Sequence, residues 1–313
     1  MLSKHKTLYL GLLILIGSFT LRFLYLGDIP GPTFDEVFYP HYGFNYLSGE
    51  NFYYVHPPLA NYLYAASIWI YSQLPWIDIA AIDTLQFEQL NPLSYRWLNA
   101  LLGSLLCLLA YFFAYAIWKN NNFALIVSFF VAIDGSLLVD SRFALANIYI
   151  VFFGLSALLC AAKSQSADVN PRYWLLSSGV LLGLVVSVKW NGLGYMLVIL
   201  SFFLALYCMQ KLDLYELRFT QNQINRLRTQ KKINSNQQKM SVINSVPQWE
   251  YLMYLVAVPL LVYIVIYIPD LQFNTQYGFL EKHQQQIGFH QTMVEANEHP
   301  YCSKWYSWPF MIR

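Results

Sequence analysis

Two adjacent carboxylates, Asp35 and Glu36, stand just after the first hydrophobic stretch of the chain. A carboxylate at a membrane interface can accept a proton from an attacking hydroxyl, and a neighbouring carboxylate can orient the acceptor or tune its partner's acidity. The same residues also suit a helix start, because Asp is a favoured N-cap and acids stabilise a first turn. The pair therefore predicts proton-transfer chemistry, a solvated helix cap, or both.

A histidine follows in the sequence Val55-His56-Pro57-Pro58-Leu59. Each proline fixes its own φ angle, and the residue before a proline is pushed out of the helical region, so the backbone at His56 is rigid. A rigid histidine facing the same compartment as the acids could bind a substrate hydroxyl or phosphate. A single histidine is more often structural, so both interpretations stay open.

Two cations, Arg142 and Lys189, occupy short turns between hydrophobic stretches. A cation there is costly unless it has a partner or a function. Arginine suits phosphate because its fork of donors stays charged. Both residues could instead extend toward the interface and be solvated. Two cations at tight turns favour an anion site, and an anion at a membrane suggests a lipid phosphate.

The last residues, 299–313, are rich in aromatic side chains and contain His299, Lys304 and Trp305. Such a segment could stack on a sugar or lie at the membrane interface. An aromatic belt preceding a further span explains it equally well.

Of the 313 residues, 57% are hydrophobic and 12% are charged. The segments that position these groups are therefore mainly hydrophobic. A soluble domain carries about 25% charged residues. The composition therefore predicts an all-α integral membrane protein, a multi-pass helical bundle, and excludes an ordinary soluble enzyme. A span needs about 20 apolar residues, which predicts seven spans, the first a retained signal anchor: 7–26, 96–118, 122–139, 143–162, 173–188, 191–209 and 249–268.

Lysine and arginine are distributed unevenly between the predicted loops. Segment 27–95 contains neither residue, whereas 210–248 holds many. Cationic loops are retained in the cytoplasm. The bias therefore predicts a cytoplasmic N-terminus and places 27–95, the turns at Arg142 and Lys189, and the tail 269–313 together on the outer face.

The sequence also predicts the structure of one of these loops and the role of another. Loop 27–95 is predicted to carry interfacial helices near 36–47 and 59–74, because aromatic rings suit the interface, although Pro40 and Gly43 interrupt the first pattern. Loop 210–248 is predicted to hold the topology and to attract anionic membrane lipids. The sequence has no glycine-rich phosphate loop or zinc-finger spacing, and no nucleic-acid partner is expected.

Several motifs together resemble a known family, the protein O-mannosyltransferases, which are membrane enzymes of the C-type glycosyltransferase superfamily. Their order runs from the first span to the end of the chain. The matching motifs are Phe34-Asp35-Glu36-Val37, Val55-His56-Pro57-Pro58-Leu59-Ala60, Asp140-Ser141-Arg142, Ser187-Val188-Lys189-Trp190-Asn191-Gly192, His299-Pro300-Tyr301-Cys302-Ser303-Lys304-Trp305 and Trp308-Pro309.

The resemblance implies a single glycosyltransferase domain over 1–313 that transfers mannose, with inversion, from a polyprenyl (dolichyl-type) phosphate to Ser or Thr hydroxyls of exported proteins. Asp35 would then be the catalytic base and Glu36 its helper in placing the acceptor. Arg142 would contact the lipid phosphate, with Lys189 as a second contact. His56 and the tail residues His299, Lys304 and Trp305 would shape the sugar and acceptor site.

The chain departs from the family pattern at two places. The family often has an acid five residues after the arginine, where this chain has Asn147, which puts a charge pairing with Arg142 in question. Members also continue with further spans beyond the Trp-Pro motif, whereas this sequence stops at Arg313. The sequence is therefore expected to be a fragment or a short variant.

Other functions fit part of the pattern. The same fold and lipid donor could serve another sugar, or a lipid or glycan acceptor. Transporters place ionisable groups near the membrane midplane and show repeated halves. In this sequence most ionisable residues lie in predicted loops or near span ends, and no duplication is evident. A transporter or a non-catalytic membrane partner is therefore disfavoured. No obligatory metal is expected, a divalent cation is left open, and the oligomeric state is not determined. A bacterial plasma membrane is the expected location.

Overall fold

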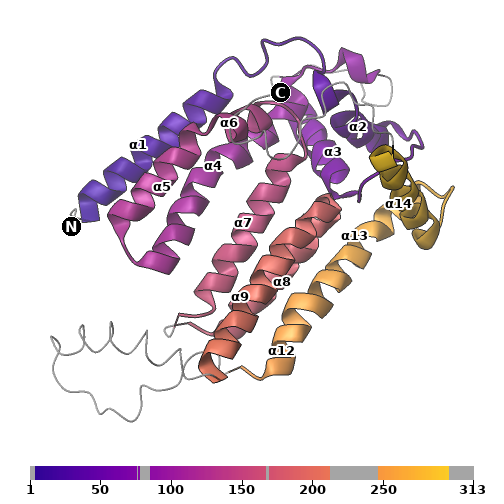
Figure 1. The fold of residues 1–313 in the computed structure, drawn as a ribbon. Helices are drawn as coiled ribbons and strands as arrows, with labels where there is room; N and C mark the ends of the chain where they lie inside the picture. Colours follow the sequence, from indigo (N-terminus) through magenta and orange to yellow (C-terminus); the bar gives the residue numbers. More distant parts are fainter. Residues whose placement is uncertain (1–3, 76, 78–84, 167–168, 212–245, 296–313) are drawn as a thin grey trace, which may run out of the picture.

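The computed structural model describes residues 4–75, 77, 85–166, 169–211 and 246–295, which form helices and connecting segments without a strand (Figure 1). The first half holds α1 (Lys4–Phe23), η1 (Phe34–Val37), α2 (Tyr39–Ser48), α3 (Leu59–Ser72), η3 (Phe87–Gln89), α4 (Leu93–Trp118), α5 (Asn121–Ile133) and α6 (Gly135–Arg142). The second half holds α7 (Asn147–Lys163), α8 (Pro171–Val188), η4 (Trp190–Gly192), α9 (Leu193–Lys211), α12 (Gln248–Leu252), the π-helical turn η5 (Met253–Ala257), α13 (Val258–Phe273) and α14 (Phe279–Glu295).

The predicted spans correspond to helices in the structure. Five helical segments among the described residues are long and apolar enough to cross a membrane: His5–Phe23, Leu93–Trp118, Pro171–Val188, Trp190–Met209 and Gln248–Phe273. The predicted span 122–139 is not straight, since α5 and α6 meet at an angle of 53° and count as one broken span or a re-entrant pair. The predicted span 143–162 is the shorter apolar helix α7. The fold is thus the expected all-α membrane bundle.

The bend between α5 and α6 has a local cause at Asp134. This residue ends α5 and caps α6, because its side chain accepts a hydrogen bond from the Leu137 amide at 2.8 Å. The new helix can then pack closely on α4 at Gly103. A Cβ atom there would lie 2.2 Å from the Cβ of Ser141, so this contact requires glycine.

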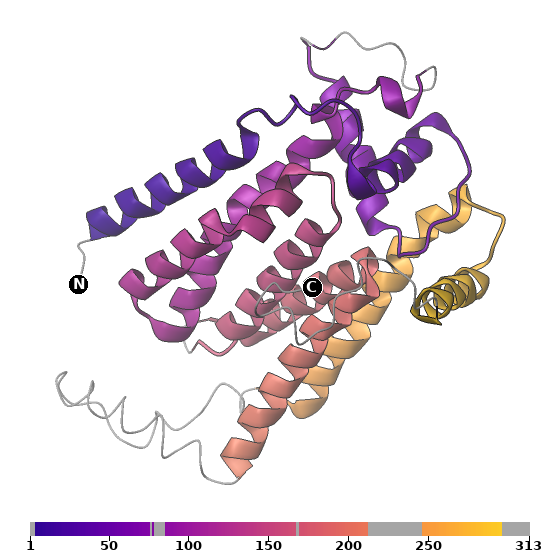
Figure 2. The same ribbon diagram turned by 45° about the horizontal axis from the view of Figure 1, so that its top comes forward.

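The helices form a bundle with two distinct ends. Helices α2, α3, α6 and α14 gather at one end, which we call the site end, whereas α12 and the turn between α4 and α5 lie at the other (Figures 1 and 2). The grouping predicted for segment 27–95 and for the turns at Arg142 and Lys189 therefore holds in the described residues. The face of the membrane on which the site end lies stays a prediction.

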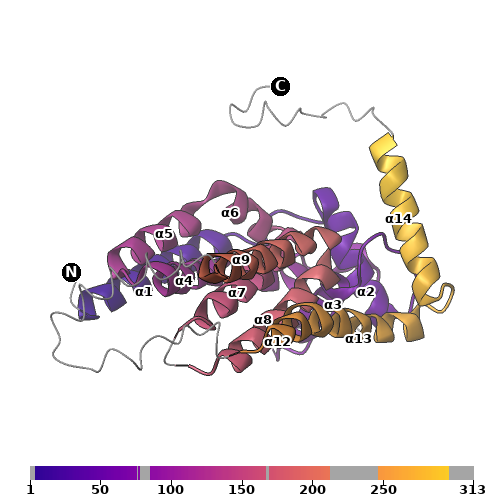
Figure 3. The ribbon, with the colours of Figure 1, turned by 60° about the horizontal axis from the view of Figure 1, so that its bottom comes forward.

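Short helices pack at the site end beside the spans. The helices predicted near 36–47 and 59–74 are present as α2 and α3, and their interfacial position stays a prediction. Pro40 does not break α2, because it lies in the first turn, where proline is tolerated. Gly43 lets α3 pack directly on α2, since a Cβ there would lie 2.6 Å from the Cβ of Tyr64. Helix α14 runs across the direction of the spans (Figure 3).

Apolar side chains point outward along the spans. They include Leu13 and Ile16 on α1, Leu197 and Leu204 on α9, and Leu260 and Leu261 on α13, all exposed. Exposed apolar surface of this extent marks a membrane or partner surface, and on helices of spanning length it fits contact with lipid.

Candidate active site

Glu36 is an acid at the site end whose two carboxylate oxygens are both bonded. Its side chain is fully buried and faces Arg96 of α4 through two parallel bonds, Nε to Oε1 at 2.8 Å and Nη2 to Oε2 at 2.7 Å. Oε1 also accepts from the Ala144 amide at 2.8 Å, and Oε2 accepts from the amide and hydroxyl of Thr33 at 2.9 Å. A buried ion pair is favourable only when such additional bonds satisfy it.

This bonding gives Glu36 a structural task, and its expected role in placing the acceptor stays a prediction. Both carboxylate oxygens are occupied, so Glu36 does not present a free oxygen to an acceptor. Instead it ties the η1 turn to α4 and to the segment that follows Arg142. Its effect on an acceptor would be indirect, through the position of the neighbouring Asp35.

Asp35 lies half-buried in the turn that Glu36 anchors. The turn begins at Phe34, whose φ of +52° is in the left-handed region, a conformation that is costly for a bulky residue. The charge of Asp35 acts on Lys189, Tyr39 and Tyr54. Burial raises the pKa of Tyr39 to about 12, with a smaller contribution from Asp35.

Lys189, which follows the last residue of α8, lies at the same place. Its ammonium lies over the Tyr39 ring, 4.9 Å from the centroid, and donates to Asn147 Oδ1 at 3.3 Å. Asn147 in turn donates to Asp140 Oδ2 at 3.4 Å. Burial lowers the pKa of Lys189, while Asp35 and Asp140 oppose that shift. Asn147 thus bonds with Lys189 and Asp140, and no bond between Asn147 and Arg142 is seen in the described part of the chain.

His56 packs against the aromatic rings of Tyr39 and His290. Its ring is parallel to that of Tyr39, with centroids 6.4 Å apart, and stacks on His290 of α14 at 5.3 Å. The pKa of His56 is lowered to about 3, first by burial and then by the charges of Lys189 and His290. The imidazole is therefore neutral at neutral pH and can act as a hydrogen-bonding group.

Arg142 is at the site end but is bound to backbone. Its Nη1 donates to the carbonyls of Leu21 and Leu24 at 2.8 Å and to that of Arg22 at 3.3 Å. The last carbonyls of a helix lack intrahelical partners and favour a cation, so Arg142 caps α1. A phosphate contact by Arg142 stays a prediction.

The family of the chain follows from a comparison with known proteins. Residues 12–273 match the family model described as dolichyl-phosphate-mannose-protein mannosyltransferase. The chain belongs to this mannosyltransferase family.

Individual relatives agree with this assignment. A Saccharomyces cerevisiae protein named dolichyl-phosphate-mannose–protein mannosyltransferase 6 is 30% identical over 64% of this chain and 28% of its own length. A Corynebacterium glutamicum protein named polyprenol-phosphate-mannose–protein mannosyltransferase is 31% identical over 45% of this chain and 28% of its own length. The chain therefore spans about a quarter of these relatives.

A solved structure has the same fold. The Saccharomyces cerevisiae protein O-mannosyltransferase Pmt1–Pmt2 complex bound to the sugar donor contains a chain that superposes with a TM-score of 0.65 at 24% identity, over 89% of this chain and 35% of that one. At this identity the match concerns the fold of the mannosyltransferase bundle.

Two buried arginines of this mannosyltransferase chain were missed in the sequence analysis. Arg96 is the first residue of a predicted span, and the signal for it was a loop with seven acids and no cation to pair with them. Arg22 lies inside the first span and donates to Ser141 Oγ at 3.0 Å, Ser18 Oγ at 2.8 Å and the Ala132 carbonyl at 2.9 Å. An arginine within a span is itself a signal, because it needs partners there.

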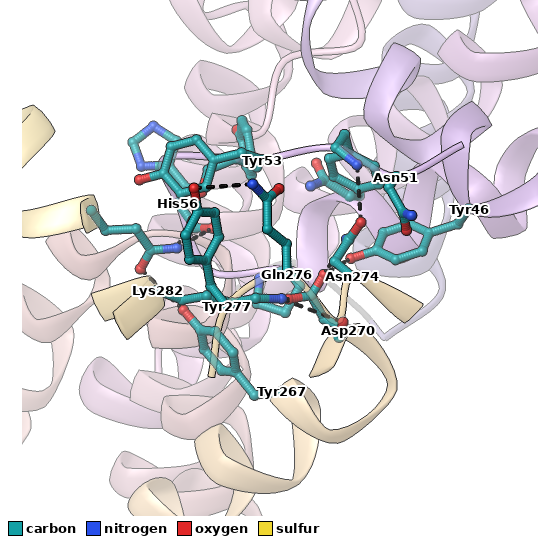
Figure 4. A pocket seen from close by; sticks show the side chains of 15 residues that line it. Tyr46, Asn51, Tyr53, His56, Tyr267, Asp270, Asn274, Gln276, Tyr277 and Lys282 are labelled. Carbon is teal, nitrogen blue, oxygen red and sulfur yellow. Dashed lines mark hydrogen bonds and ion pairs between the residues drawn. The ribbon is translucent and has the colours of Figure 1, made fainter. Parts of the chain in front are cut away.

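A pocket at the site end is lined in part by His56 (Figure 4). It lies between the segment around His56, the end of α13 and α14. The predicted tail residues His299, Lys304 and Trp305 lie outside the described residues, so their expected contribution to the site stays a prediction.

Proposed function

We propose that this chain transfers a mannosyl group from a polyprenyl phosphate to a Ser or Thr hydroxyl of a protein, with inversion at the sugar carbon. The observation that carries the proposal is the position of the Lys189 ammonium over the Tyr39 ring, where the charge of Asp35, from a distant part of the sequence, acts on both side chains. Family membership supports the choice of sugar and lipid donor. The site would face the outside of a membrane, with a bacterial plasma membrane as the predicted location.

The transfer step needs a base and a charge that holds the leaving group. Asp35 takes the proton from the acceptor hydroxyl while the hydroxyl oxygen forms a bond to C1 of mannose. The bond from C1 to the phosphate oxygen breaks, and its electron pair leaves with the polyprenyl phosphate. Lys189 stabilises the negative charge that develops there.

The other residues hold these two groups in position. The pair of Glu36 and Arg96 fixes the turn that carries Asp35. The neutral imidazole of His56, parallel to the Tyr39 ring, offers a hydrogen bond to a sugar or acceptor hydroxyl. Arg142, at the end of α1, is proposed as a second, weaker phosphate contact.

We propose that no metal ion is obligatory for this step. Among the described residues, no group of three or more His, Cys, Asp or Glu side chains could hold a metal ion, and Lys189 supplies a positive charge for the phosphate. Transfer is then expected to persist in EDTA. Loss of activity in EDTA and its recovery with a divalent cation would contradict this part of the proposal.

The test is mannose transfer from a polyprenyl phosphate mannose to a Ser/Thr peptide by the chain in nanodiscs. A positioned general base contributes about 10² to 10⁴ in rate, so Asp35→Asn is expected to lower turnover by that factor. Asp28→Asn is the matched control, because Asp28 is exposed in the same segment. Wild-type turnover in Asp35→Asn would remove Asp35 from the mechanism, and no transfer by the unaltered chain would count against the function itself.

A further inference from the structure

The Lys189 ammonium is held by two long contacts of its own. It lies 4.9 Å from the centroid of the Tyr39 ring and donates to Asn147 Oδ1 at 3.3 Å. Lysine carries its charge on a flexible aliphatic stem, so contacts of this length do not fix the ammonium by themselves. Its position therefore depends on the backbone from which the side chain starts.

That backbone belongs to a tight turn that folds back onto α8. Lys189 follows the last residue of α8 in an extended conformation, with φ −154° and ψ 149°, and η4 begins at the next residue, Trp190. The Gly192 amide donates to the Lys189 carbonyl at 2.9 Å. A Cβ at Gly192 would lie 2.6 Å from the carbonyl oxygen of Val185, so the close approach of the turn to the helix requires glycine. The direction in which Lys189 leaves α8 is thus set by how this turn is seated.

The side chain of Trp190 anchors the turn to two other helices. Its indole Nε1 donates to the hydroxyl of Tyr263 on α13 at 2.9 Å, and Tyr263 is only 9% exposed. The indole ring also stacks on His283 of α14, with centroids 6.0 Å apart, and contacts His290 of the same helix at 5.9 Å. Trp190 is therefore held by one hydrogen bond to α13 and by two rings of α14.

The Tyr263 hydroxyl also bonds with α14. Its oxygen lies 2.8 Å from His283 Nε2, and His283 Nδ1 lies 2.7 Å from the Phe279 carbonyl oxygen. A carbonyl only accepts, so Nδ1 carries a proton, and in the neutral ring Nε2 is then an acceptor. The oxygen of Tyr267 is farther from the Tyr263 hydroxyl, at 3.3 Å. Tyr263 therefore donates to His283 and accepts from Trp190, so that one hydroxyl joins the turn to α14.

Helix α14 is itself fixed at the site end. Lys282 pairs with Asp270 of α13, and Gln286 donates to the His56 carbonyl at 3.0 Å. Both Lys282 and Gln286 are buried, and α14 runs across the direction of the spans (Figure 3). A bond from the turn after α8 to α14 is therefore a bond to a fixed element.

We propose that Tyr263 is a positioning residue of the transfer step, an inference that rests on the proposed function. Its hydroxyl holds Trp190, Trp190 seats the turn, and the turn places the Lys189 ammonium where the departing phosphate needs it. Tyr263 acts through Lys189 and not by contact with a substrate. A displacement of about 1 Å in a reacting group can cost about 10² in rate, so the loss of this one hydroxyl should be measurable.

The test compares Tyr263→Phe, which removes only the hydroxyl, in two backgrounds of the full chain in nanodiscs. In the unaltered chain it is expected to lower kcat for mannose transfer about tenfold while KM for the peptide changes less than about twofold. In the Lys189→Gln background it is expected to change kcat less than about twofold, because the effects of residues that act as one unit do not add. Trp190→Phe, which removes the indole N–H, should give the same pattern. Tyr251→Phe is the control, because it removes a phenol hydroxyl from α12 at the other end of the bundle.

A second measurement follows Lys189 without catalysis. Burial lowers the pKa of Lys189, and the pH dependence of its acetylation, followed by mass spectrometry, reports that pKa. Tyr263→Phe is expected to raise the pKa of Lys189 toward its ordinary value, because a loosened turn exposes the ammonium to water. The acetylation profile of Lys163, in the last turn of α7, should be the same in both proteins.

The outcomes separate this inference from the proposed function. Equal losses of kcat in the two backgrounds show that Tyr263 only stabilises the fold, which overturns the inference and leaves the enzyme assignment intact. A rise in peptide KM alone places Tyr263 at the acceptor and also overturns it. If the unaltered chain transfers no mannose, the proposed function fails, and an unchanged pKa of Lys189 in both variants then overturns the positioning role as well. If Tyr263→Phe does not fold, Trp190→Phe carries the test.

Discussion

The ammonium nitrogen of Lys189 lies 4.9 Å from the centre of the Tyr39 ring. Tyr39 begins the helix that follows the acidic turn, whereas Lys189 ends α8 on another part of the bundle. Because the ring also stacks against His56, one aromatic side chain holds a cation and a neutral imidazole beside Asp35. The cation and the base of the proposed mechanism therefore both act on the surroundings of one ring.

Lys189→Gln should lower mannose transfer strongly, since it removes the charge that stabilises the departing phosphate. Removal of one such group typically costs about 10²–10³ in kcat. The measurement is kcat with polyprenyl phosphate mannose at saturating peptide. Lys163→Gln, in the last turn of α7, is the control. Equal rates for the two variants would exclude Lys189 from phosphate stabilisation.

Glu36→Ala should destabilise the fold, because it leaves Arg96 buried without its carboxylate partner. Removal of one member of a buried ion pair costs about 3–5 kcal/mol. The measurement is the unfolding midpoint of the purified chain in detergent, with Glu88→Ala, an exposed acid of η3, as control. An unchanged midpoint together with lost activity would instead indicate direct contact of Glu36 with a substrate.

The stability of the chain should fall in acid through His56. Its folded pKa of about 3 lies below the unfolded value of 6.5, so the unfolded chain binds a proton that the folded chain does not. This contribution is complete above pH 6.5 and is lost as pH falls toward 3, with a slope of at most about 1.4 kcal/mol per pH unit. His56→Gln should flatten the unfolding midpoint against pH over this window. His5→Gln, in exposed sequence near the N-terminus, should keep the wild-type slope.

Arg142→Gln should weaken the end of α1, because the carbonyls of Leu21 and Leu24 lose their shared donor. A cation at a helix C-terminus contributes about 1–2 kcal/mol in favourable geometry. Thermal unfolding of Arg142→Gln and Arg142→Lys measures this loss, and lysine is expected to restore part of it. Wild-type stability with a raised donor KM in Arg142→Gln would show that the arginine serves the phosphate alone.

Local patterns in the sequence predicted much of the bundle. Hydropathy located the spans, and the lack of Lys and Arg in 27–95 grouped the segments that meet at the site end. The helices α2 and α3 were also predicted, because their aromatic pattern is a local feature, whereas the first-turn position of Pro40 became clear only in the structure. The break at Asp134 was missed, since a hydropathy window averages over one capping residue.

The sequence by itself determined which chemical groups stand at one end of the bundle, because hydrophobicity and charge bias fix the order of spans and loops. Tertiary structure decided which of these groups meet. Only packing pairs Glu36 with Arg96, brings Lys189 beside Asp35, directs Arg142 to the end of α1, and sets Asn61 in the wall of a pocket formed with α13 and α14. The physical reason is that several cations and acids share one face, and their partners depend on contacts between helices far apart in the chain.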